Sequence, residues 1–94
     1  PTFLHRVKIK HKAEGLKEPS GIVVSGDGTL WTVSDDTKRV FALSPSGKLL
    51  EEVGFKIDAK DLEGLALRHE DNVLLAVQEG TNEILEVRVD RGMV

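Results

Sequence analysis

The chain has 94 residues, of which 39% are hydrophobic, and its 13 basic and 16 acidic side chains give a net charge of −3. This composition is too apolar for a disordered segment, and the length allows one small domain. Because the chain has no cysteine, disulfides and thiolate zinc sites are excluded, and no apolar run reaches the ~20 residues of a membrane-spanning helix.

The first segment, residues 1–12, mixes apolar and basic side chains in the way an outer strand does. Four basic residues are interspersed with apolar ones: Arg6, Lys8, Lys10 and Lys12. A nucleic-acid surface is the alternative, but one Trp and three Phe are too few for a base-stacking platform. We therefore predict an outer strand, and we expect neither nucleic acid nor a membrane as a partner.

The next segment predicts four short strands separated by turns. Turn-forming residues recur at short intervals, at 25–28 (Ser-Gly-Asp-Gly), 35–38 (Asp-Asp-Thr-Lys) and 44–47 (Ser-Pro-Ser-Gly). Asp and Gly supply the positive φ angles that tight hairpin turns need. The apolar runs between these turns predict an antiparallel meander, whose strands begin near Gly21, Leu30, Arg39 and Lys48.

The second half carries a conflicting helix signal. Residues 61–68 are rich in helix formers, so propensity alone predicts a helix from residue 62 to residue 77. However, Gly64 and the polar cluster at 69–72 interrupt it, and residues 85–89 alternate between apolar and charged, as in a strand. We therefore predict an all-β fold, with further strands that begin near Gly64, Val73 and Glu83.

An internal repeat connects the two halves. Residues 20–24 match residues 63–67 at a step of 43 residues, and residues 30–35 match residues 74–79 at a step of 44. A period of this size with four strands is typical of a β-propeller blade. Counting strands from a at the centre to d at the rim, the predicted order is d-abcd-abc. The chain is thus expected to be one two-blade module over residues 1–94, with a swapped outer strand at 1–12, a first blade at 18–57 and a second blade, lacking its own outer strand, at 60–90.

Several segments resemble known propellers. Ser20-Gly21-Ile22, residues 30–36 and residues 39–48 resemble a blade of the NHL and gluconolactonase-like superfamily. With Lys-Asp-Leu-Glu-Gly-Leu-Ala at 60–66, the chain is more similar to the SdiA-regulated family of bacterial propellers. This resemblance implies a six-bladed ring and a place outside the cytoplasm, in the bacterial periplasm or envelope. A chain of two blades is then expected to be an excised or engineered piece of a propeller, or to complete the ring as a homotrimer.

The homotrimer has a physical reason. Two blades share one interface and leave an apolar sheet face on each side, and large apolar patches are rare on monomers. Head-to-tail association buries both faces. Residues 3–9 of one chain are expected to pair with residues 83–89 of its neighbour, which also covers an open strand edge.

Acidic residues occur at matching places in the two repeats. Two of them follow the second strand of the first blade, one follows the second strand of the second blade, and two precede that blade's innermost strand. Connections that open on one side of a propeller would gather these carboxylates, and Ca²⁺ takes about six to eight oxygen ligands. These carboxylates are candidate calcium ligands, but we favour the alternative that they cap turns and keep the rim soluble, because no contiguous calcium loop is present. The candidate ligands are Asp35, Asp36, Asp61, Glu63 and Glu79.

No catalytic residue can be assigned from the sequence. His5, His11 and His69 lack a metal-ligand spacing, and no serine lies in a Gly-x-Ser-x-Gly motif. Trp31 is expected to pack between blades. We therefore predict a self-assembling propeller scaffold or binding module, with a small ligand at the channel mouth. The alternatives are a calcium-dependent hydrolase of the lactonase or esterase-like phytase type, which the resemblance implies, and a free-standing β-sandwich interaction domain.

Overall fold

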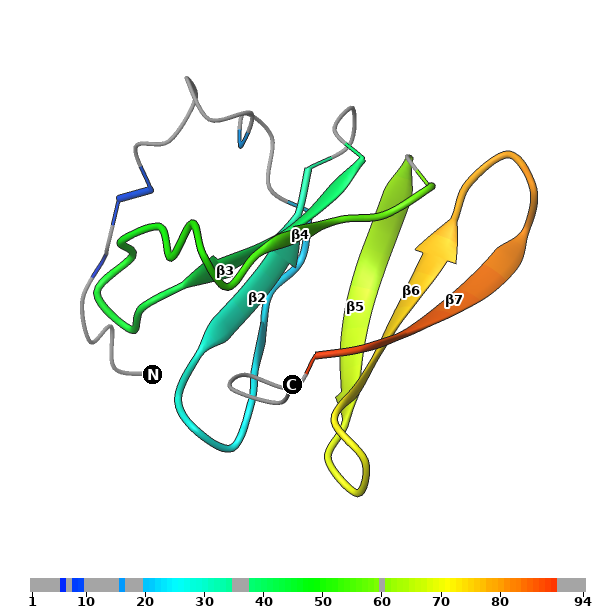
Figure 1. Ribbon diagram of the computed structural model, residues 1–94. Coiled ribbons are helices and arrows are strands. Elements are labelled where there is room, and N and C mark those ends of the chain that lie inside the picture. Colours follow the sequence, from blue (N-terminus) through cyan, green and yellow to red (C-terminus); the bar gives the residue numbers. More distant parts are fainter. Residues whose placement is uncertain are drawn as a thin grey trace, which may run out of the picture.

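The computed structural model describes residues 6, 8–9, 16, 20–34, 38–59 and 61–89. Within these ranges the chain forms seven strands in two antiparallel sheets and contains no helix (Figure 1). The predicted all-β fold is therefore confirmed. Among these residues, accordingly, no helix is long and apolar enough to span a membrane.

The first sheet consists of β1 (Val23–Val24), β2 (Leu30–Val33), β3 (Arg39–Leu43) and β4 (Phe55–Lys56), in the order β1-β2-β3-β4. The predicted hairpin turn joins β1 to β2. Its Asp27 carboxylate accepts hydrogen bonds from the Ser25 hydroxyl at 2.6 Å and from the Thr29 amide at 3.0 Å. Gly28 has a φ of 88°, which the absence of a side chain permits.

The second sheet consists of β5 (Leu62–Arg68), β6 (Val73–Gln78) and β7 (Glu83–Arg88), in the order β5-β6-β7. The rejection of a helix over residues 62–77 is confirmed. Gly64 does not begin a strand, because it lies inside β5 at a bulge between Glu63 and Leu65, with a φ of 60°. The bulge shifts the pairing of β5 with β6 by one residue.

The fourth strand does not begin where the sequence predicted. It was expected from Lys48 onwards, but residues 51–53 form a turn, and β4 begins only at Phe55. Ahead of this turn, Leu49 makes an isolated bridge to Leu43. The predicted start of the fourth strand is therefore seven residues too early.

The turn depends on Leu50 and Gly54. The Leu50 amide donates to the Ala42 carbonyl at 2.8 Å, and the Leu50 carbonyl then accepts from the amides of Val53 at 3.1 Å and Gly54 at 3.2 Å. These bonds turn the chain away from the edge of the sheet. When it returns, Gly54 lies so close to β3 that a Cβ there would be 2.8 Å from the Val40 carbonyl oxygen.

Gly54→Ala is therefore expected to destabilise the fold. A methyl group at this position meets backbone, which cannot rotate away, and overpacking of this kind costs about 1–3 kcal/mol. Urea denaturation followed by circular dichroism measures the loss. Gly26→Ala is the control, because a Cβ at Gly26 meets no atom within 4 Å. Equal stability of the two variants would contradict the close approach at Gly54.

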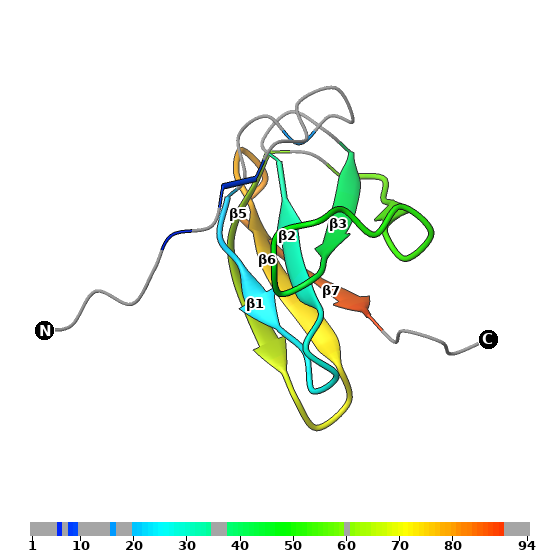
Figure 2. The ribbon, with the colours of Figure 1, turned by 90° about the vertical axis from the view of Figure 1, so that its left-hand side faces the viewer.

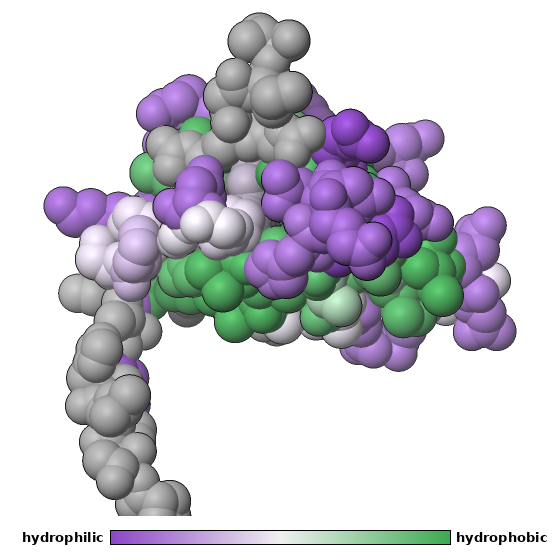
Figure 3. Space-filling view, turned by 90° about the horizontal axis from the view of Figure 1, so that it is seen from below, coloured by the Kyte–Doolittle hydropathy of each residue, from purple (hydrophilic) through white to green (hydrophobic). Residues whose placement is uncertain are grey.

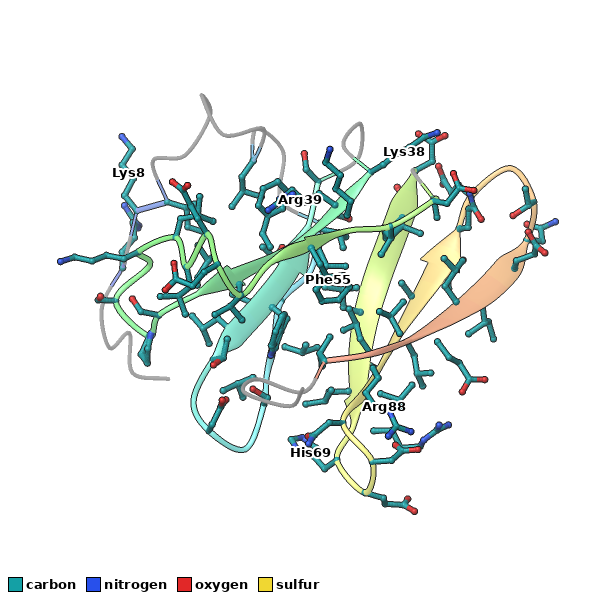
Figure 4. All side chains as sticks on the ribbon, in the orientation of Figure 1. Lys8, Lys38, Arg39, Phe55, His69 and Arg88 are labelled. Atoms are coloured by element: carbon teal, nitrogen blue, oxygen red, sulfur yellow. The ribbon has the colours of Figure 1, made fainter. Side chains whose placement is uncertain are left out.

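An apolar core lies between the two sheets. β1 and β2 contact β5, so the first strands of both sheets lie side by side (Figure 2). Phe55 lies between the sheets (Figure 4), and its ring centroid is 6.3 Å from that of Trp31. Trp31 is thus buried between the sheets, as the sequence predicted. The buried residues of this core are Trp31, Val33, Val40, Ala42, Ala59, Leu62, Leu74, Ala76 and Val89.

A second, smaller cluster lies on the other side of the first sheet. Leu16 is buried there against Phe41 and Leu43, and Ile9 packs on the same cluster. Most of the predicted swapped strand at 1–12 lies outside the described residues, so its pairing remains a prediction. Ile9 nevertheless lies on the first sheet.

Candidate functional site

Three of the five predicted calcium ligands lie in the described part of the chain. Asp61 and Glu79 are at one end of the β5–β6 pair, where the Glu79 amide donates to the Asp61 carbonyl at 3.0 Å, and Glu63 pairs with Val77. All three residues are exposed. Across the described ranges, no three His, Cys, Asp or Glu side chains gather as metal ligands. Asp35 and Asp36 lie outside these ranges, so the calcium site remains a prediction.

A calcium titration tests that prediction. Binding to the folded state is expected to raise the Tm by mass action, and Glu63→Gln is expected to remove the rise. Glu70→Gln, which removes an exposed acid outside the predicted set, serves as the control. An unchanged Tm at millimolar calcium would leave the five acids as turn caps and solubilising charges.

The two sheets meet through one face each, which we call their inner faces. Partners across the strands share a face, and the apolar core identifies which face is inside. The inner face of the first sheet carries Val23, Trp31, Val33 and Val40. The inner face of the second sheet carries Leu65, Leu74, Ala76 and Leu85.

The second sheet has a further apolar face, turned away from the first sheet, which we call the open face. It carries Ala66, Leu75, Val77 and Ile84. Val77 is 47% exposed and Ile84 is 71% exposed. The open face also has a shallow hollow of about 280 Å³, whose lining includes these residues. Hydrophobic residues exposed between hydrophilic ones are visible from below (Figure 3).

The open face repeats the inner face of the first sheet. At a step of 44 residues, Val33 corresponds to Val77 and Val40 corresponds to Ile84. Val33 and Val40 are 0% exposed because the second sheet covers them. The chain thus presents, uncovered, the same kind of surface that it buries between its own sheets.

One end of the open face is charged. Arg68 makes two hydrogen bonds to the Asp71 carboxylate, both at 3.0 Å, and one to Glu86 at 3.2 Å. The hydrogen bonds from Arg68 lower the pKa of Asp71 below its ordinary value, so this carboxylate is ionised at neutral pH. Arg88 lies near the same end of the sheet (Figure 4). The exposed ion pairs therefore border the apolar part of the face.

The first sheet also has an outward face, which we call its far face. Ile22 and Val24 are about half exposed. Farther along this face, the Arg39 guanidinium lies 6.0 Å from the centre of the Phe41 ring. Beside this pair is a hollow of about 320 Å³, lined by Arg39, Phe41, Leu49, Leu50, Glu51 and Gly54.

Comparison with known proteins identifies the family. The model of the SdiA-regulated family matches residues 3–93, which is nearly the whole chain. The chain belongs to the SdiA-regulated family. Comparison with curated proteins and with solved structures found no significant match to the chain. The resemblance to that family is confirmed, whereas membership of the wider NHL and gluconolactonase-like superfamily remains a prediction.

The sequence analysis located acidic residues and predicted an apolar sheet face on each side of the two blades, but it did not identify the residues of the open face. Val77 and Ile84 were assigned to strands, but alternation alone does not say which face of a strand is covered. The signal that could have found them is the repeat. Each residue of the open face corresponds, at the step of 43 or 44, to a residue of the buried inner face of the first sheet.

Proposed function

We propose that this family member is a self-assembling β-propeller module, in which each sheet is a blade and three copies close a six-bladed ring. The proposal rests on the open face, where Val77 and Ile84 are exposed while their counterparts in the repeat, Val33 and Val40, are buried. This repetition favours a second copy of the chain as the partner of the open face, because the two sheets of one chain already pack against each other through a face of this kind.

The number of copies follows from the resemblance and from symmetry. Two sheets per chain can close only an even-bladed ring, and the six-bladed relatives favour three copies. A contact between two different faces either closes into a ring or grows into a fibre. The proposed product is a closed scaffold, with its channel mouth open to a small ligand.

The N-terminal segment has a role in this scheme. β7 is an edge strand of its sheet, and an uncovered edge recruits other strands. We propose that residues 3–9 of a neighbouring copy pair with β7. The packing of Ile9 on the first sheet supports this, because it brings the end of that segment to the face where the neighbour docks.

The mass in solution tests the proposal. Light scattering of the whole chain at micromolar concentration is expected to give three times the mass of one chain. A folded, soluble monomer would contradict self-assembly and favour the β-sandwich alternative, in which the two sheets of one chain form the complete domain.

A further inference from the structure

We infer that the open face of one copy packs on the far face of the next copy's first sheet, in the register that the two sheets of a single chain already show. The inference rests on the proposed self-assembly and specifies its contact. It excludes a symmetric dimer made by two open faces, which would leave Ile22 and Val24 of the far face half exposed.

The first argument is that the far face resembles the inner face of the second sheet, whose role it would take in the contact with another copy. Within one chain, the inner face of the first sheet packs on the inner face of the second. On the second sheet, Leu65 and Leu67 belong to that inner face, and their counterparts on the far face are Ile22 and Val24, which are about half exposed. Both pairs are large and apolar, so the next copy presents a surface of the same kind.

The second argument sets the register. A Cβ at Gly21 would lie 3.3 Å from the Leu65 amide nitrogen, so the two sheets approach closely at this point. At the step of 43, Gly21 corresponds to Gly64 and Leu65 corresponds to Ile22. In the assembly, Gly64 of one copy therefore lies near Ile22 of the next. Ala66, two residues along on the open face, is then close to the same contact.

The third argument concerns a charge of the open face whose counterpart in the repeat is apolar and buried. Glu86 of the open face corresponds to Ala42, which is buried between the sheets. Burying an unpaired carboxylate would oppose the contact. Glu86, however, accepts a hydrogen bond from Arg68 at 3.2 Å, so it enters the interface as half of an ion pair.

Thiol cross-linking tests this register. The chain has no cysteine, so Ala66→Cys and Ile22→Cys each introduce a single thiol at a site where the side chain is exposed. A short bismaleimide is expected to link the two variants only when they are mixed. The variant that carries both substitutions is expected to give linked species of up to three chains on a denaturing gel, and none larger. Ser46→Cys, in an exposed turn, replaces Ile22→Cys as the control.

Each outcome decides a different point. Linked dimers from Ala66→Cys alone would overturn the inference in favour of a symmetric contact, while self-assembly would stand. An assembly of three-chain mass without links between positions 66 and 22 would also overturn it. A ladder beyond three chains would replace the ring with a fibre. A monomeric mass without links would contradict the proposed function itself.

Discussion

Ile84→Lys is expected to convert the proposed three-chain assembly into folded single chains. Ile84 is 71% exposed in the single chain, so the substitution removes little packing from the fold. In the proposed assembly the same position would be buried, as Val40 is within the chain, and a lysine there would be desolvated without a partner. A loss of about 2 kcal/mol, the size that marks an interface hot spot, raises the dissociation constant by about 30-fold.

Light scattering and circular dichroism together measure this result. The expected combination is a mass of one chain with an unchanged β spectrum. Thr81→Lys is the matched control, because it adds the same charge at an exposed turn only three residues away. A three-chain mass for Ile84→Lys would show that the open face lies outside the interface.

Trp31→Ala is expected to cost about 3–5 kcal/mol, which is a large share of the roughly 5–15 kcal/mol by which a typical domain is stable. Trp31 is 1% exposed, and its ring packs near Phe55 between the sheets. Its indole nitrogen also donates to the Ser25 hydroxyl at 3.0 Å, which joins the core to the turn between β1 and β2. Truncation removes both the packed volume and this hydrogen bond.

Leu75→Ala is the matched comparison, because Leu75 corresponds to Trp31 in the repeat but lies on the open face. Both substitutions are best made in the Ile84→Lys chain, so that stability does not depend on assembly. Urea denaturation is followed by circular dichroism, because Trp31→Ala removes the only tryptophan of the chain and with it the fluorescence signal. Similar costs for the two variants would contradict the assignment of Trp31 to the covered face and Leu75 to the open one.

Local chemistry made much of the fold readable from the sequence. The Asp27-Gly28 turn correctly predicted a hairpin and the alternation over residues 85–89 correctly predicted a strand, because turn conformation and side-chain alternation depend on near neighbours. The fourth strand was misplaced because its turn, Glu51-Glu52-Val53, lacks the usual turn residues. That turn depends on Gly54 lying against the Val40 carbonyl, and Val40 is far away in the sequence.

The open face, too, combines a feature that the sequence showed with one that only the structure showed. The sequence by itself determined that the two halves repeat, and therefore that Val33 resembles Val77 and that Val40 resembles Ile84. Only the tertiary structure decided which member of each pair is buried. Burial depends on which sheet faces meet, and a repeat step makes two faces alike without saying which of them is covered.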